Sequence, residues 1–358
     1  MRLDLRFKMG IPTMRRCTTP AFSSAGLIVL ALCGSGCIIK PPGPSYRGPL
    51  SDLTSAQLGI RDSLRRDVQA VAAIGPRATM RLQSIPDGYE FVRDPGKLHE
   101  AAEWVARRAG QSGATVTRHE YDVAGTTCAN LEVELPGRSH PKEIVVVSAH
   151  YDTVPGSPGA NDDGSGVAAL FWLIESLQSA HCDRTIRFLF FVNEELPHAY
   201  TEEMGSRVYA KACRQRGDNI VAMLSLDPIG YYSREKGSQK YPWPLNWYYP
   251  STGDFLGVVS NRANAGLMKR VVASFRRHAR FPSEGVAMNV SDVERSDHGS
   301  FWLNGYPAVL VTDTGEFRDP NYHAASDTPD KVDYDALARV VEGLRGVILD
   351  LASVNEKD

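Results

Sequence analysis

The chain has 358 residues, of which 42% are hydrophobic and 23% charged. This is ordinary globular composition, with enough length for a large core. Residues 1–36 hold 5 basic and 1 acidic residue, which leaves 35 basic against 41 acidic residues in the remainder. A mildly acidic body without a basic run excludes nucleic acid as the expected partner.

Residues 1–36 have the pattern of an export signal. Arg15 and Arg16 precede a short apolar run, residues 25–32, and small residues then lead to Cys37. A basic start, a short apolar core and a small-residue site predict a secretory signal peptide, and the apolar run is too short for a stable transmembrane helix. We therefore expect an exported protein, with a disordered leader on a soluble protein as the alternative.

The small residues before Cys37 also resemble a bacterial lipoprotein processing site, in which that Cys becomes lipidated. Gly34 departs from this pattern, because such sites commonly have Leu three residues before the Cys. The bacterial periplasm, a membrane anchored through Cys37, and the extracellular space all stay open. No later apolar run predicts a membrane span, so a lipid on Cys37 is the only membrane contact expected.

The body of the chain begins with a Pro- and Gly-rich linker, residues 37–50, and one domain is predicted over residues 51–354. Apolar residues at helical spacing predict helices over residues 53–74 and 97–109. Alternating patterns predict strands over residues 115–122 and 130–135, with a turn at residues 125–127.

A run of β-branched residues over 144–147 predicts a strand buried on both faces, as in a parallel sheet. His150 and Asp152 follow it, two residues apart. A Pro- and Gly-rich loop then leads to Asn161-Asp162-Asp163 and to a helical pattern. Imidazole and carboxylate at the carboxyl end of a sheet strand indicate a site, and they are groups that zinc accepts as ligands.

Three further apolar runs, residues 187–192, 222–226 and 308–311, end in the same way. The polar residues that follow them are, in order, Glu194 and Glu195, Asp227, and the segment from Asp313 to His323. This repetition predicts an α/β fold: a single domain with a mixed, mainly parallel central sheet flanked by helices on both faces. One site is expected along the carboxyl edge of that sheet.

Taken singly, each polar residue has a structural explanation as a cap, a turn or a solvated edge. Taken together, two His and three carboxylates converge, which is what a pair of zinc ions needs if one carboxylate bridges them. The five predicted metal ligands are His150, Asp162, Glu195, Asp227 and His323.

The order of the motifs carries a resemblance to a known family. The motifs are His-x-Asp, Asn-Asp-Asp-Gly-Ser-Gly, Asn-Glu-Glu, Asp-x-Ile-Gly, Ser-Asp-His and Tyr-His-x-x-x-Asp. In this order they resemble the M28 family of dinuclear zinc peptidases, of the aminopeptidase Y type, from about residue 98 to the C-terminus.

The resemblance implies a role for each matching residue. Asp162 bridges two zinc ions, His150 and Asp227 complete one of them, and Glu195 and His323 complete the other. Glu194 is the general base that takes a proton from the attacking water.

The same resemblance implies that Asp152 holds the His150 ring in its liganding tautomer. His298 and Tyr322 are candidate substrate contacts, and a structural hydrogen bond is the alternative for His298.

Two segments have no assigned role. The chain is longer than the family pattern at residues 196–203, directly after the predicted general base, and this insertion is expected to shape the substrate pocket. The aromatic segment, residues 231–249, is broken by Pro242 and Pro244 and is expected to form a loop, which either walls the pocket or packs on itself. Outside the leader, Cys128, Cys182 and Cys213 allow one disulfide with one thiol, or three buried thiols.

The leading hypothesis is an exported or membrane-tethered zinc aminopeptidase that acts on peptide N-termini. The alternatives are glutaminyl cyclisation, carboxypeptidase action with Arg295 or Arg318 holding a terminal carboxylate, and a binding module of the same fold without activity. The oligomeric state stays open.

Overall fold

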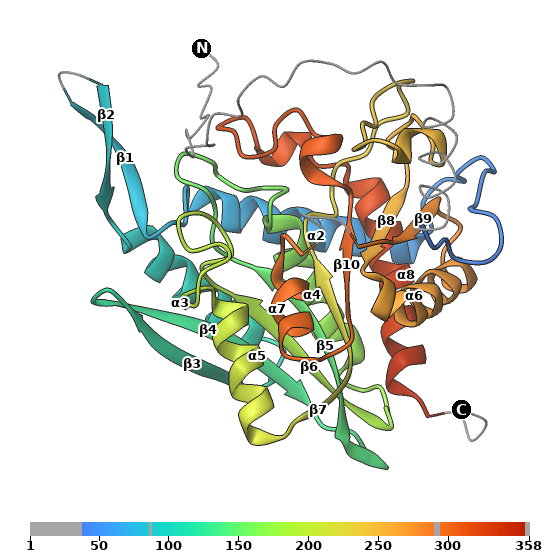
Figure 1. Ribbon diagram of the computed structural model, residues 1–358, viewed down its shortest axis with the longest axis horizontal. Coiled ribbons are helices and arrows are strands. Elements are labelled where there is room, and N and C mark those ends of the chain that lie inside the picture. The colour runs from blue at the N-terminus through green and yellow to red at the C-terminus, as the bar shows by residue number, and fades with distance from the viewer. Residues whose placement is uncertain (1–37, 86–87, 290–293, 355–358) are drawn as a thin grey trace, which may run out of the picture. The chain divides into compact units, whose positions relative to one another are not determined.

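The computed structural model describes residues 38–85, 88–289 and 294–354. Its centre is an eight-stranded sheet with the strand order β3-β4-β6-β5-β7-β10-β8-β9 (Figure 1). The strands are β3 Val116–Val123, β4 Thr126–Leu135, β5 His140–His150, β6 Arg184–Phe191, β7 Asn219–Leu226, β8 Leu256–Ser260, β9 Ser283–Ala287 and β10 Ala308–Thr312. A separate hairpin consists of β1 Met80–Ile85 and β2 Gly88–Arg93.

The middle of the sheet is parallel and its flanks are mixed. Strands β6, β5, β7 and β10 run parallel to their neighbours in this set, whereas β3, β4 and β6 pair antiparallel, as do β10 and β8. Parallel neighbours place their carboxyl ends at one edge, where open α/β folds have their sites. The predicted fold class is confirmed.

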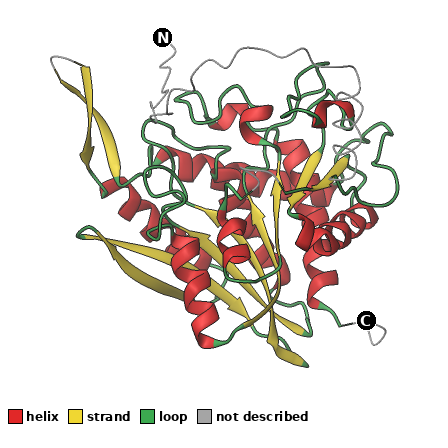
Figure 2. Cartoon of the chain, viewed as in Figure 1, coloured by secondary structure: helices red, strands yellow, loops and turns green. Residues whose placement is uncertain are grey.

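Helices cover both faces of the sheet (Figure 2). They are α2 Ser55–Ala73, α3 Gly96–Gly110, α4 Gly164–Leu177, α5 Gly205–Arg216, α6 Ala265–His278, α7 Asp297–Leu303 and α8 Tyr334–Ala352. Val145 and Val147 of β5 join the core that α2, α4 and α8 cover, while Ile144 and Val146 join the core under α5 and α7. This two-sided burial explains why residues 144–147 show no polar alternation.

The two N-terminal helices form where the apolar spacing predicts them. Thr54 accepts a hydrogen bond from the Gln57 amide, and the Gln57 side chain accepts one from the Thr54 amide, so a capping box begins α2. The apolar face of α3, including Leu98 and Val105, is buried. Both helices lie within two residues of their predicted bounds.

Some sequence-based expectations need adjustment. Strand β4 begins at Thr126, so the turn after β3 is shorter than expected and consists of Ala124 and Gly125, both with positive φ. The β1–β2 hairpin and strands β8 and β9 were not predicted, because their short runs carry weak apolar patterns. Cys128, Cys182 and Cys213 are buried free thiols, as one of the two alternatives held.

The described part of the predicted linker, residues 38–50, contacts the rest of the domain. Ile39 forms an antiparallel bridge with Ala287 of β9, and Arg47 pairs with Glu284 at 2.7 Å. The Arg276 guanidinium donates to carbonyl oxygens of Pro42 and Gly43. Proline prevents this segment from forming a helix, and the edge strand β9 pairs with the backbone of Ile39. None of the described helices is both long and apolar enough to cross a membrane.

Candidate metal centre

The parallel strands deliver the predicted ligands to one edge of the sheet. His150 is the last residue of β5, and Asp227 directly follows its neighbour β7. Glu194 and Glu195 follow β6, the neighbour of β5 on the other side. Asp162 comes from the loop that enters α4 and His323 from the loop after β10. All five predicted ligands are brought together.

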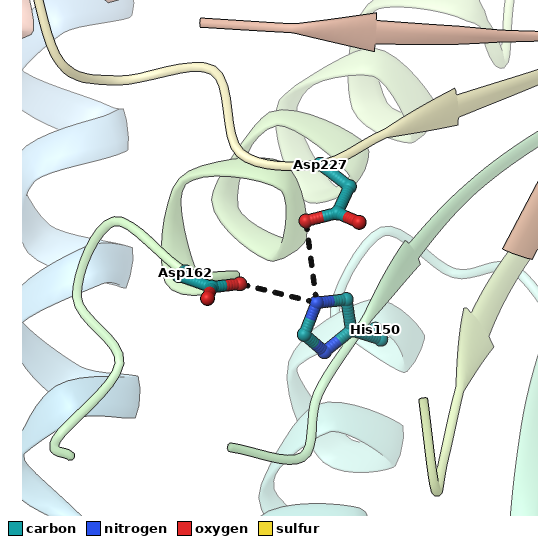
Figure 3. A group of neighbouring side chains, drawn as sticks. All are labelled: His150, Asp162 and Asp227. Carbon is teal, nitrogen blue, oxygen red and sulfur yellow. Dashed lines mark ion pairs between the residues drawn. The ribbon is translucent and has the colours of Figure 1, made fainter. Parts of the chain in front are cut away.

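The first trio of possible ligands is His150, Asp162 and Asp227 (Figure 3). His150 Nε2 lies 3.3 Å from Asp162 Oδ1 and 3.4 Å from Asp227 Oδ1. Both carboxylates point at the same ring nitrogen, and His150 and Asp162 are buried.

The second trio is Asp162, Glu195 and His323. His323 Nε2 lies 3.1 Å from Asp162 Oδ2 and 3.0 Å from Glu195 Oε1. Asp162 therefore turns one oxygen to each trio. In both trios the donor atoms lie within 4.8 Å of one another.

The donor set fits zinc. Ligands about 2.0–2.2 Å from a tetrahedral zinc lie roughly 3.3–3.6 Å from one another, and the observed separations are close to that range. His150 Nδ1 lies 3.1 Å from the backbone oxygen of Asp152. A proton on Nδ1 satisfies that contact, so Nε2 keeps its lone pair for a metal.

Asp152, which is expected to hold the His150 ring in its liganding tautomer, contacts both His150 and the two glutamates. Its carboxylate lies farther from His150 Nδ1, at 3.6 Å, than its backbone oxygen does. The two carboxylate oxygens accept hydrogen bonds from the amides of Glu194 and Glu195 at 3.2 and 3.0 Å. Asp152 thus orients the imidazole with its backbone and the two glutamates with its side chain.

A network of carboxylates supports the loop that carries Asp162. The two oxygens of Asp327 accept the amides of Asn161 and Asp162 at 2.8 and 3.1 Å. The Asn161 side chain donates to Asp313 and Asp319 at 2.9 and 3.2 Å. Burial raises the pKa of Asp327 to about 7 and that of Asp313 to about 7.

Asp163 links the same loop to β5. Its carboxylate accepts the Gly166 amide at the start of α4 and the His150 amide, both at 3.1 Å. Burial raises the pKa of Asp163 well above its usual range. A Cβ at Gly166 would lie 2.6 Å from the Asp163 oxygens and 2.7 Å from the Leu226 carbonyl, so only glycine fits there.

Arg77 is a supporting residue that sequence reasoning missed. It is fully buried, and its guanidinium donates to the carbonyl oxygens of Tyr151, Pro158 and Gly159 at 2.6–3.0 Å. Burial lowers the pKa of Arg77 to about 10, although Asp152 and other site carboxylates oppose this. These hydrogen bonds hold the loop between β5 and α4 in place. A lone Arg in a Gly-Pro-Arg segment gave no signal of this role.

The electrostatics of the site favour a cation. Burial raises the pKa of Glu194 well above its usual range, and Asp227 and Glu195 raise it further. Burial alone would lower the pKa of His323, but Glu195 and Asp162 outweigh it and raise that pKa to about 10. Without a metal the imidazoles therefore hold protons beside the carboxylates, and a divalent cation can replace those protons.

The two candidate substrate contacts lie in different places. Tyr322 stacks on His323, with ring centroids 3.9 Å apart and an interplanar angle of 15°. His298 is buried in α7 with its ring edge-on to Trp302. Burial raises the pKa of its neighbour Asp297 to about 7, with His150 lowering it and Asp227 raising it.

The insertion, residues 196–203, directly follows Glu195 and is held by hydrogen bonds of His198. His198 bridges Thr79 Oγ1 at 2.8 Å and Glu203 Oε2 at 2.9 Å, and its amide donates to the carbonyl oxygen of Glu195. Leu196 and Tyr200 in this segment are 63% and 48% exposed. The insertion therefore presents apolar side chains next to a candidate ligand.

The aromatic segment is a loop, as its prolines predict, with one short 3-10 helix at Leu245–Trp247. Tyr241 packs on Tyr249, whose hydroxyl donates to the Gly285 carbonyl at 2.8 Å. These contacts favour a self-packed loop over a wall of the metal site.

A mixed α/β sheet with His and carboxylate trios at its carboxyl edge defines a metal-dependent hydrolase. Residues 130–348 match the profile of Peptidase family M28. The chain belongs to this family of zinc-dependent metallopeptidases, as its motif order predicts.

Two curated relatives illustrate the similarity. The chain is 30% identical over 258 residues to the uncharacterized protein YfbL of Escherichia coli, covering 69% of this chain and 78% of the relative. It is 28% identical over 295 residues to a probable leucine aminopeptidase 1 of Trichophyton verrucosum, covering 77% and 73%.

Solved structures share the fold. The LapA aminopeptidase of Legionella pneumophila superposes with a TM-score of 0.62 at 18% identity, covering 87% of this chain and 78% of that one. A glutaminyl cyclase of Bacteroides thetaiotaomicron superposes with a TM-score of 0.59 at 19% identity, covering 81% and 97%. At this level of identity the likeness extends to the fold alone.

Proposed function

We propose that this metallopeptidase is an exported aminopeptidase that holds two zinc ions and uses Glu194 as its general base. The observation that carries the proposal is Asp162, whose two oxygens face two separate trios of ligands. A single-metal enzyme needs only one of these trios, so the presence of both supports a metal pair.

In this proposal Asp162 is shared, His150 and Asp227 hold one ion, and Glu195 and His323 hold the other. Bound zinc supplies Lewis acidity, which lowers the pKa of water and polarises a peptide carbonyl. The buried carboxylates and the oriented His150 tautomer keep the donors in place for this chemistry.

In this proposal Glu194 moves the proton. It directly precedes Glu195, and Asp152 accepts the amides of both, so the backbone that carries Glu194 is held together with that of the proposed ligand beside it. It accepts a proton from the attacking water and returns it to the leaving amine. Its burial excludes bulk water from competing for that proton.

Peptide N-termini are the proposed substrates, and the relatives named as aminopeptidases support this. The contacts of the two arginines weigh against carboxypeptidase action. Arg295 pairs with Glu316, and Arg318 is buried and donates to Gln239 Oε1 at 2.8 Å. Both guanidiniums have partners within the protein, which disfavours their holding a terminal carboxylate, although Arg318 Nη2 is buried without a hydrogen-bond partner among the described residues.

The test is Glu194→Gln. We expect kcat on aminoacyl-nitroanilides to fall by about 10²–10⁴-fold, with about two zinc per chain retained, because the ligands are untouched. Glu202→Gln, an exposed glutamate of the insertion, is the control and should keep full activity. Loss of zinc in Glu194→Gln would instead show that Glu194 is a ligand.

Glutaminyl cyclisation is tested in the same preparation. Emission spectrometry that finds one zinc per chain, with release of pyroglutamate from an N-terminal glutaminyl peptide and no peptide hydrolysis, would replace the aminopeptidase proposal. A chain that binds no metal would be a binding module.

We also propose export with a lipid on Cys37, on the strength of the leader pattern and the small residues before that Cys. Metabolic labelling with palmitate should mark the parent chain and not Cys37→Ser. An unlabelled parent chain recovered from the periplasm would remove the lipid and keep export, and recovery from the cytoplasm would remove both.

A further inference from the structure

The aromatic segment, residues 231–249, is called the aromatic loop below. It carries an apolar surface that the proposed function does not use. Trp243 and Trp247 are each 70% exposed, and Tyr248 is 38% exposed. The two indole rings pack edge to face with centroids 5.9 Å apart. Large aromatic side chains held together in water indicate an interaction surface.

This surface is built on a fixed loop. Leu245 is buried beneath it, and the amides of Trp247 and Tyr248 donate to the carbonyl oxygens of Pro244 and Leu245 at 3.1 and 2.9 Å. Two prolines, Pro242 and Pro244, restrict the backbone further. The backbone that carries the indoles is therefore restricted, which lowers the entropic cost of binding.

Lys40, near the start of the described residues, contacts the same surface. Lys40 Nζ donates to the Tyr248 carbonyl at 2.6 Å and lies 4.5 Å from the centroid of the Tyr249 ring. Lys40 follows Cys37 by only three residues, and three residues span at most about 11 Å. A lipid on Cys37 would therefore be attached three residues before a side chain that contacts this surface.

The charge around the surface also suits a membrane. Lys240 lines the same hollow as Trp243, and Lys40 lies beside Tyr248. Within residues 231–249, the exposed charged residues are Arg234, Lys236 and Lys240 against Glu235. Trp and Tyr are enriched at the level of lipid headgroups, and exposed cations attract anionic lipids.

We propose that Trp243, Trp247 and Tyr248, together with Lys40 and Lys240, insert into the headgroup region of an anionic bilayer. This proposal rests on the proposed location at a membrane and not on the proposed reaction. The lipid on Cys37 supplies the attachment, and the aromatic surface fixes how the catalytic domain is oriented on the membrane.

A glycan is the other ligand that exposed indoles could stack on. A hollow of about 280 Å³ beside Trp243 is lined partly by polar residues, including Gln239, Asn246 and Ser251. The bilayer is favoured because the indoles point outward and are mostly exposed, and because cations accompany them on both the loop and the N-terminal segment.

The test uses residues 38–358, which form one compact unit and contain every described helix and strand. Without a lipid, this chain should sediment with vesicles of phosphatidylethanolamine and phosphatidylglycerol. Trp243→Ser/Trp247→Ser should lower the partition coefficient by roughly tenfold or more, because both indoles lose their apolar burial. Phe91→Ser, which removes a 54% exposed ring from β2, is the matched control and should change nothing.

A second readout locates the contact. Brominated acyl chains should quench the tryptophan fluorescence of the parent chain and of Phe91→Ser, and quench the double variant much less. Hydrolysis of a soluble aminoacyl-nitroanilide should be equal in all three chains, which shows that they are folded and separates this proposal from the proposed reaction.

Two results would overturn the proposal. One is equal vesicle partitioning by the parent chain and the double variant. The other is binding to peptidoglycan sacculi that only the double variant loses, with vesicle partitioning unchanged, since this would assign the surface to a glycan.

Discussion

At the scale of single residues, the position of Asp162 depends on side chains that are not themselves candidate ligands. Asp327 accepts its amide and that of Asn161. The next residue, Asp163, accepts the His150 amide, and Arg77 donates to a carbonyl oxygen of the preceding loop. These partners are buried polar groups with satisfied hydrogen bonds, and removing one leaves its partners unsatisfied. Outer groups of this kind commonly matter to metal affinity by about 10–100-fold.

We therefore expect Asp327→Asn to weaken zinc binding. An amide offers one oxygen acceptor and turns an NH2 group toward the second backbone amide, so one of the two hydrogen bonds is lost. Zinc affinity, measured by competition with a chromophoric chelator, should fall by about 10–100-fold. Asp330→Asn, a mostly exposed carboxylate three residues away, is the control. Unchanged affinity in Asp327→Asn would show that the ligands hold themselves in place.

At the scale of elements, His198 is one of the residues that join the insertion to the body, beside Glu203, whose carbonyl oxygen accepts the Tyr121 hydroxyl. Its ring connects Thr79, directly before β1, with Glu203 at the far end of the insertion, and its amide contacts Glu195. The exposed Leu196 and Tyr200 thus sit on a segment fixed at both ends. A segment that contacts substrate equally in the ground state and the transition state affects KM and leaves kcat unchanged.

His198→Ala should raise KM by roughly tenfold while kcat changes little and zinc content stays constant, because the insertion loosens and the ligands keep Asp152. His198→Gln, which can still bond Thr79, should recover part of the loss. Steady-state kinetics on peptides of several lengths will measure this. A fall in kcat at constant KM would place His198 in the chemistry instead.

At the scale of the whole molecule, the metal centre concentrates buried charge at one sheet edge, so stability should depend on metal and pH together. In the metal-free protein, burial raises the pKa values of Asp313 and Asp327 to about 7, and neighbouring carboxylates raise that of His323 to about 10. Each folded-state pKa exceeds the unfolded value. The folded chain therefore binds more protons, and the stability they contribute is lost as pH rises through these values.

Chelator-treated protein should accordingly melt at a lower temperature at about pH 8 than at about pH 5. Zinc-loaded protein should melt higher than the chelated form at about pH 8, because the bound cation stabilises the folded state. Scanning calorimetry of both forms will measure this. A chelated form that is more stable at the higher pH would contradict the assignment of these buried groups.

The sequence by itself determined which polar residues follow each of the buried parallel strands. Runs such as residues 144–147 are apolar without alternation because both faces of the sheet are covered, and this pattern is local. Polar residues after such runs converge because parallel strands end at one edge. For this reason the sequence alone predicts that His150, Glu195 and Asp227 lie together. Asp162 and His323 came from loops, and the motif order identified them.

Only the tertiary structure decided which groups support that site. Asp327 meets Asp162 across 165 residues of sequence and Arg77 meets Gly159 across 82, and no periodic pattern encodes such contacts. The antiparallel bridge of Ile39 to Ala287 likewise turned a predicted linker into part of the β9 edge. Local spacing predicts what a segment can form, whereas the partner of a buried polar group depends on where the whole chain places the other end of the bond.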